Sequence, residues 1–151
     1  MILPNSFVVM ADKTLKLASD IVVGDILMTV DIKTEIYIPS LVSMITKKVQ
    51  TSVMCNDMKV GQDSFLGIWV QENKRVNGYD LHFSNPVISN RVLVYKSNDD
   101  NLEKSIIHRC DSLEPEQFLE FQSIGQTYIA GPTKFGPFFI FLSGVVLQKV
   151  G

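Results

Sequence analysis

The sequence predicts a single all-β domain, residues 1–151, made of many short strands and one short helix. Three observations predict it. Short runs rich in β-branched and aromatic residues recur along the chain, turn signals separate them, and only one segment carries helix-start signals. A chain of 151 residues corresponds to one domain, which is large enough to bury roughly two-thirds of its unfolded surface.

Six runs are predicted to be strands because their apolar residues alternate or are continuous over a strand's length. They are residues 7–10, 26–30, 36–45, 65–70, 87–95 and 138–142. Turn signals lie between them. Residues 12–14 form a tight polar turn, 23–25 contain Gly-Asp, 72–78 end in Asn-Gly, and Ser143-Gly144 is typical of a two-residue hairpin turn.

One helix is predicted, between residues 111 and 125. Asp111 or Ser112 can cap its start, Pro115 suits its first turn, and Gly125 can end it. Acidic and apolar residues support the same interpretation, the acidic ones at its positive end and the apolar ones along one side: Glu114, Glu116, Leu113, Phe118, Leu119 and Phe121.

Charge and composition narrow the classes of protein to which the chain can belong. Fourteen basic and sixteen acidic residues give a formal charge of -2, without the basic excess that binding to nucleic acid requires. No apolar run reaches the roughly 20 residues that a membrane-spanning helix needs. No Lys or Arg precedes Asp12, so a charged signal-peptide start is missing. We therefore expect a soluble intracellular protein, free or part of an assembled particle.

The two cysteines, Cys55 and Cys110, are too few for a disulfide framework and lack the spacing of metal ligands. Free thiols in a reducing compartment are the favoured interpretation, and a single bridge stays open as the alternative. No metal and no cofactor is expected, because neither a ligand cluster nor a phosphate-binding glycine motif is found.

The first residues carry a specific pattern. The chain begins MILPNSFVVMADKTLKLASDIVVGDIL, with a strand, a polar turn, an apolar segment and then Ile21-Val-Val-Gly-Asp25 leading into a strand. This block resembles the opening of the Hint fold, which inteins share with the self-processing part of Hedgehog proteins. Residues 138–149 resemble the closing hairpin of that family more faintly. The resemblance implies a Hint-like fold, favoured over a generic β-barrel or β-sandwich, in which residues 7–10 lie beside residues 138–150.

The resemblance also implies self-processing chemistry, but the positions that would carry it are occupied by other residues. Met1 stands where the family has a nucleophilic Cys or Ser, and a thioether has no proton to give up. Ser84 and Val87 stand at the ends of the Thr-x-x-His motif. Gln148 and Lys149 stand at the terminal His-Asn pair, where Asn would cyclise. We therefore expect no catalytic residues and no enzyme activity.

Other clusters of reactive side chains have a simpler interpretation as packing or surface. His108 and Cys110 lie two residues apart, a spacing compatible with a Cys/His nucleophile pair, but such neighbours usually pack or face solvent. His82 and His108 lack further donors for a metal site. Asp99, Asp100 and Glu103 are expected to form a solvated loop.

A protein-interaction role remains as the predicted function. The chain would act as a non-catalytic scaffold or a structural subunit of a larger assembly, for example a minor virion component, through a protein partner or self-association. The expected contact residues are Phe135, Phe138, Phe139 and Phe141, because alternation turns them to both faces of one strand. One alternative is that another layer of the same domain covers these rings. The other functional alternative is residual self-cleavage.

Overall fold

The computed structural model of the chain describes residues 1–32, 34, 36–70, 81–96, 101–108 and 110–143. These residues form an all-β structure with a single 3-10 turn, η1 (Ala18–Asp20). The described strands are β1 (Phe7–Val9), β2 (Leu15–Leu17), β3 (Ile26–Val30), β4 (Tyr37–Cys55), β5 (Met58–Gly61), β6 (Leu66–Ile68), β7 (His82–Ser84), β8 (Arg91–Lys96), β9 (Asn101–Ile106), β10 (Cys110–Ser123), β11 (Thr127–Gly131) and β12 (Phe138–Leu142).

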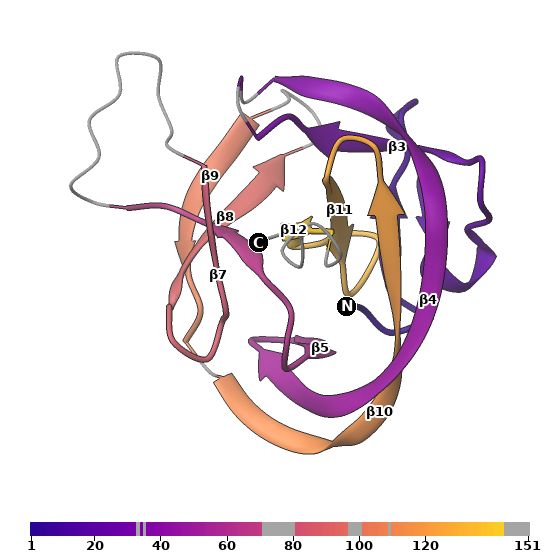
Figure 1. Cartoon of the computed structure of the whole chain (residues 1–151). Coiled ribbons are helices and arrows are strands. Elements are labelled where there is room, and N and C mark those ends of the chain that lie inside the picture. Colours follow the sequence, from indigo (N-terminus) through magenta and orange to yellow (C-terminus); the bar gives the residue numbers. More distant parts are fainter. Residues whose placement is uncertain (33, 35, 71–80, 97–100, 109, 144–151) are drawn as a thin grey trace, which may run out of the picture.

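The strands form two sheets. The larger has the order β2-β1-β11-β12-β6-β7, with β8 pairing with both β12 and β9. The smaller has the order β10-β4-β3, and β5 also pairs with β4. The antiparallel pair of β4 and β10 is a long curved ribbon that sweeps round the molecule, while β11, β12 and the N-terminus lie inside it (Figure 1).

Most predicted strands are confirmed, although their lengths differ. Residues 26–30 and 138–142 match β3 and β12. The run at 36–45 continues to Cys55, because its polar second half pairs with β10. The run at 87–95 is shorter than predicted, since residues 87 and 88 lie in a turn and β8 begins at Arg91. The loop at 72–78 and Gly144 lie outside the described residues.

The predicted helix is wrong. Residues 110–123 form β10, which pairs along most of its length with β4. Pro115, which suits a helix start, instead follows a register shift between Ser112 and Pro115, where a missing N–H costs no ladder bond. Ser52 Oγ donates to the Glu114 carbonyl oxygen at 2.6 Å in this irregular stretch. Pairing with a long partner strand outweighs the local helix signals.

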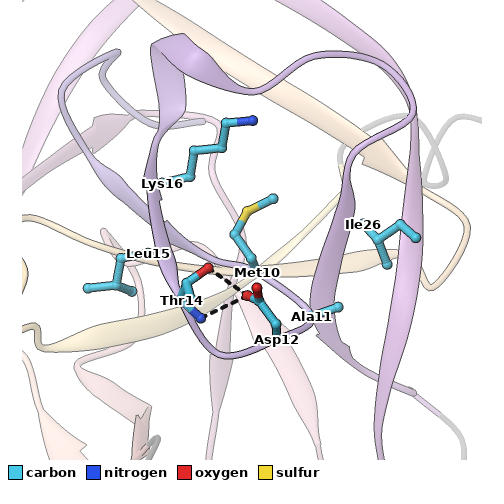
Figure 2. Close-up of a pocket in the computed structure, with 7 residues that line it drawn as sticks. All are labelled: Met10, Ala11, Asp12, Thr14, Leu15, Lys16 and Ile26. Atoms are coloured by element: carbon cyan, nitrogen blue, oxygen red, sulfur yellow. Dashed lines mark hydrogen bonds between the residues drawn. The ribbon is translucent and has the colours of Figure 1, made fainter.

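Both predicted N-terminal turns are confirmed. Asp12 Oδ1 accepts bonds from the Thr14 backbone N–H at 3.0 Å and from the Thr14 hydroxyl, which closes the β1–β2 turn (Figure 2). Gly24 has φ +98°, a conformation that side-chain-bearing residues rarely adopt. Asp25 Oδ2 accepts bonds from the Val22 N–H at 3.0 Å and from Lys16 Nζ at 2.8 Å.

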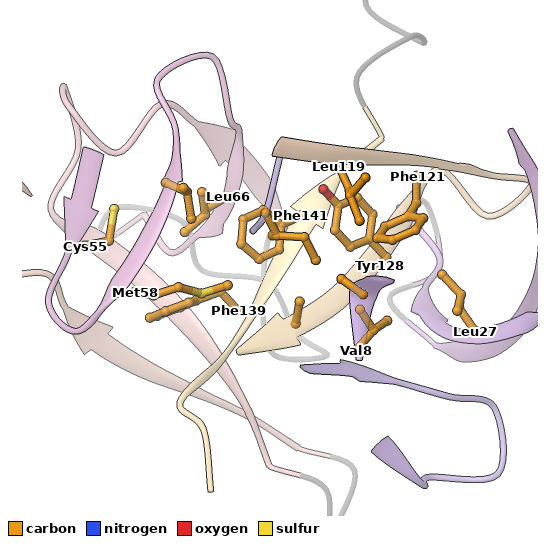
Figure 3. Packing of buried hydrophobic residues seen from close by; sticks show 14 of the residues in the cluster. Val8, Leu27, Cys55, Met58, Leu66, Leu119, Phe121, Tyr128, Phe139 and Phe141 are labelled. Atoms are coloured by element: carbon orange, nitrogen blue, oxygen red, sulfur yellow. The ribbon is translucent and has the colours of Figure 1, made fainter. Parts of the chain in front are cut away.

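Strand β12 is buried on both faces, as its sequence requires. Phe139 and Phe141 pack into one hydrophobic cluster with Val8, Leu27 and Tyr128 (Figure 3). Phe138 and Ile140 belong to a second cluster on the other face of the sheet. Alternation of side chains along the strand therefore divides one apolar run between two cores.

The two segments that the Hint resemblance places together lie in one sheet but are not direct neighbours. β11 lies between β1 and β12, pairing with both. Two strand spacings, about 10 Å, therefore separate them. The second half of the predicted closing hairpin, from residue 144 onward, lies outside the described residues.

Candidate functional site

Met1 lies inside the fold, held by its backbone. Ile2 forms isolated bridges with Val60 of β5 and Leu119 of β10, so the chain start runs between these strands. The Gly61 N–H donates to the Met1 carbonyl oxygen at 3.0 Å. The Met1 residue is 5% exposed. Pairing to two strands at once fixes the first residue in the interior.

A buried polar cluster surrounds the Met1 nitrogen. This nitrogen donates to Ser64 Oγ and to the Tyr128 hydroxyl, both at 3.0 Å. The Tyr128 hydroxyl donates in turn to Glu120 Oε1 at 2.7 Å, and that oxygen lies 3.9 Å from the Met1 nitrogen. The Ser64 hydroxyl donates to the Met1 carbonyl oxygen at 3.2 Å. We call these four residues, Met1, Ser64, Glu120 and Tyr128, the Met1 centre.

Burial dominates the electrostatics of the Met1 centre. It lowers the pKa of the Met1 amino group, because a charged ammonium is costly away from water; the nearby Glu120 carboxylate raises that pKa in part, and Lys48 lowers it. Burial also raises the pKa of the Tyr128 hydroxyl well above its ordinary value, and the charge of Glu120 and the bond to it act in the same direction. The Tyr128 hydroxyl therefore stays protonated and donates a hydrogen bond to Glu120.

This pKa shift predicts a loss of stability in alkaline solution. Above about pH 10 the unfolded chain loses the Tyr128 proton while the folded protein keeps it, so the unfolded state binds fewer protons and the free energy of unfolding falls as pH rises. Below about pH 10 this contribution is fully present. Urea denaturation of wild type and Tyr128→Phe between pH 8 and pH 11 measures it. The variant should lose less stability over this range, and equal slopes would contradict the assignment.

The side-chain hydrogen bonds at Met1 come from residues other than those of the predicted motifs. Val87, at the position of the family's imidazole, is 57% exposed. Ser84 ends β7 and is half-buried, and His82 at the start of β7 is exposed. The residue that follows β7, Asn85, does contact the Met1 centre, because its Nδ2 donates to the carbonyl oxygen of Ser64 at 3.3 Å. Gln148 and Lys149 lie outside the described residues.

Sequence reasoning missed three members of the Met1 centre: Ser64, Glu120 and Tyr128. Glu120 had a usable signal, since it is a single carboxylate inside the apolar run from Phe118 to Phe121 and is 4% exposed. A buried carboxylate needs hydrogen-bonding partners. Ser64 and Tyr128 carried no comparable signal, because only the fold brings residues 64 and 128 to residue 1.

The predicted contact surface needs a correction. Phe138, Phe139 and Phe141 are 9%, 1% and 0% exposed, because the domain covers both faces of β12. These rings therefore belong to the core, as the covered-face alternative expected. Phe135, in the turn before β12, is 95% exposed and is the one of the four that reaches solvent.

The remaining clusters stay separate from the Met1 centre. His108 is exposed, with its backbone N–H bonded to Asn56 Oδ1 at 2.9 Å, and Cys110 lies opposite Cys55 rather than beside an imidazole. Across the described part of the chain, no three His, Cys, Asp or Glu side chains form a group that could hold a metal ion. Asp99 and Asp100 lie outside it.

A surface hollow of about 410 Å³ lies at the β1–β2 turn and is lined by Met10, Ala11, Asp12, Thr14, Leu15, Lys16 and Ile26 (Figure 2). Its two charged groups are already paired, Asp12 with Thr14 and Lys16 with Asp25. It lies at the turn and includes no residue of the Met1 centre. Within the described ranges, no helix has the length and apolar character needed to cross a bilayer.

We compared the sequence and the fold with those of known proteins. No protein-family model and no curated protein matches the sequence. Among solved structures, a splice-inactive variant of the AceL NrdHF class 3 split intein is similar, with a TM-score of 0.72, 12% identity, and coverage of 95% of this chain and 98% of that one. A DnaB intein from Synechocystis gives a TM-score of 0.62 at 12% identity, covering 94% and 97%.

A bacterial intein-like domain from Clostridium thermocellum is also similar, with a TM-score of 0.61, 13% identity, and coverage of 95% and 97%. The similarity extends over nearly the whole of each chain, whereas the sequences have diverged almost completely. The chain therefore has the Hint fold of inteins and intein-like domains.

Proposed function

We propose that the chain is a Hint-fold module that does not process itself and works by binding protein, either a partner or a second copy, as a subunit of a larger assembly. The observation that carries the proposal is the side chain at the first position. Met1 lies buried where the family resemblance places a nucleophilic thiol or hydroxyl, and it brings a thioether.

The surroundings of Met1 support this proposal. An acyl shift needs a nucleophile that loses a proton and an acid that protonates the departing nitrogen. The Ser64 hydroxyl donates to the Met1 carbonyl oxygen, and Tyr128 donates to Glu120 with a raised pKa. Both histidines of the sequence, His82 and His108, are exposed. The centre is suited to holding the first residue.

Exposed apolar side chains support a binding role. Besides Phe135, three exposed apolar residues form a row at one end of the smaller sheet: Ile26, Leu41 and Ile124. Ile26 and Leu41 are register partners in β3 and β4, and the Ile124 N–H donates to the Leu41 carbonyl oxygen. Their exposures are 49%, 41% and 70%. Contiguous exposed apolar groups are typical of protein contact sites.

Sedimentation velocity at micromolar concentration tests the binding role. Wild type should associate with itself or with a protein captured from its native source, and Phe135→Ser or Leu41→Ser should weaken that association by tenfold or more, as loss of a central apolar contact does. Val49→Ser is the matched control, because Val49 is 70% exposed on β4 but lies outside the row. A wild-type chain that stays monomeric and captures no partner contradicts the proposal.

Residual self-cleavage is the second candidate, and one distance favours it. Ser64 Oγ lies 3.0 Å from the Met1 nitrogen, so an acyl group on that nitrogen would place its carbonyl carbon near a hydroxyl. The test is a chain with a short peptide added before Met1, incubated with hydroxylamine or dithiothreitol and followed by intact mass. An unchanged mass supports the proposal. Release of the added peptide, abolished by Ser64→Ala, would make self-cleavage the better assignment.

A further inference from the structure

The two cysteines of the chain face each other across the long β4–β10 ribbon. Cys110 and Cys55 are register partners at its end, and both thiols are free. Directly opposed residues of antiparallel strands have Cα atoms about 4.5 or 5.5 Å apart, and either separation lies within the range of a disulfide. Each thiol acts on the pKa of the other, as expected for side chains that face each other across the ribbon.

We propose that Cys55 and Cys110 are a modification site that a disulfide oxidant such as oxidised glutathione converts into an intramolecular disulfide joining β4 to β10. The alignment is already made by the strand pairing, so the bond needs only a change in side-chain rotamers.

The reaction balances as two thiol–disulfide exchanges. The Cys110 thiolate attacks one sulfur of oxidised glutathione, and the first glutathione leaves as a thiolate. The Cys55 thiolate then attacks Cys110 Sγ and expels the second glutathione. The protein loses two protons and two electrons, and one oxidised glutathione becomes two reduced molecules. Cys110 reacts first because it is partly exposed, whereas Cys55 is fully buried.

Burial makes the second exchange the slow one. It raises the pKa of Cys55 to about 12, with the neighbouring Cys110 acting in the same direction, and it raises the pKa of Cys110 as well. The attacking species is the thiolate, whose fraction rises tenfold per pH unit while pH stays below the pKa. Closure of the bridge should therefore accelerate by up to about tenfold for each unit between pH 7 and pH 9.

The bridge would join two residues that are far apart in sequence. It closes a loop of 54 residues (110 − 55 − 1), which contains β5 to β9. Restricting a loop of this length in the unfolded chain raises Tm, by on the order of 10 °C for a domain of this size.

The experiment exposes the native chain to oxidised glutathione at pH 7, 8 and 9, quenches with acid and measures intact mass and non-reduced peptide maps. Wild type should lose two hydrogen atoms and yield a peptide pair linked through Cys55 and Cys110. The oxidised form should show the higher Tm. Cys55→Ala should stop at a glutathione adduct on Cys110, and Cys110→Ala should remain unmodified.

Three outcomes would overturn the proposal. One is wild type that accumulates the Cys110 adduct without closing the bridge at pH 9. Another is a dimer of two chains linked through Cys110. The last is wild type that keeps two titratable thiols after prolonged oxidation. Each can be read directly from the masses, whether or not the proposed binding role of the chain is correct.

Discussion

Truncating Glu120 to Ala is expected to lower the free energy of unfolding by about 3–5 kcal/mol. Glu120 is 4% exposed, its Oε1 accepts the Tyr128 hydroxyl at 2.7 Å, and the same oxygen lies 3.9 Å from the Met1 nitrogen. Removing the carboxylate leaves the Tyr128 donor without its acceptor and the Met1 nitrogen without its counter-charge. Equilibrium urea denaturation followed by circular dichroism measures the loss.

Glu120→Gln is the matched control, because it keeps the shape and an acceptor for Tyr128 but removes the charge. We expect it to cost about 1–2 kcal/mol, less than the Ala variant. A similar loss in both variants would show that the charge, rather than the hydrogen bond, dominates at the Met1 centre. A loss below about 1 kcal/mol in Glu120→Ala would contradict the buried cluster itself.

Phe141→Ala is expected to cost about 3–5 kcal/mol, the range for truncating a fully buried aromatic ring. The Phe141 ring is 0% exposed and stacks on Tyr128 with centroids 5.2 Å apart (Figure 3). Tyr128 in turn meets Phe121 edge-on at 5.5 Å. The cavity would therefore open beside the ring that bonds Met1, and thermal and urea denaturation should both report the loss.

Phe135→Ala provides the comparison within the same phenylalanine-rich segment. Phe135 is 95% exposed, so its truncation should change the free energy of unfolding by less than about 0.5 kcal/mol. The difference between Phe135→Ala and Phe141→Ala would distinguish the exposed ring of this segment from a ring in the core. Comparable losses at positions 135 and 141 would contradict the assignment of β12 to the core.

The all-β class, the first strands and turns, and the strand at 138–142 were predictable because their signals are local. Gly24 and Asp25 form a turn from their own backbone and side-chain chemistry. The apolar run Phe138–Leu142 predicted a strand, but it left open whether a partner or the same domain covers its faces. The Hint resemblance in the first residues rests on the same local turns. These features need no knowledge of distant contacts.

The segment 110–123 could not be predicted in this way. Its acidic start, Pro115 and its apolar residues satisfy the rules for a helix N-terminus, and the four buried residues from Phe118 to Phe121 show no period of two. What decides its conformation is β4, a partner more than fifty residues away in sequence. Such tertiary pairing overrides a propensity that spans only a few tenths of a kcal/mol per residue.

The Met1 centre could not be predicted either, because it also depends on contacts between residues far apart in sequence. Its members are separated by 63 positions between Met1 and Ser64 and by 127 between Met1 and Tyr128. Hydrogen-bonding side chains at those distances have no common sequence pattern. The sequence showed that Met1 lacks a nucleophile, but only the fold shows what holds Met1 instead.

The buried first residue also sets an order of events in folding. Met1 bonds to Ser64 and Tyr128, and Ile2 exchanges backbone bonds with Leu119 at 2.8 and 3.0 Å. On the ribosome these contacts cannot form until residue 128 has left the exit tunnel, so Met1 and Ile2 stay without these partners while the residues up to Tyr128 are made. Closure over such sequence separations is slow, with all-β domains requiring about milliseconds to seconds. Docking of Met1 and Ile2 is therefore expected among the last steps, which makes it the step most sensitive to a chaperone that holds this segment.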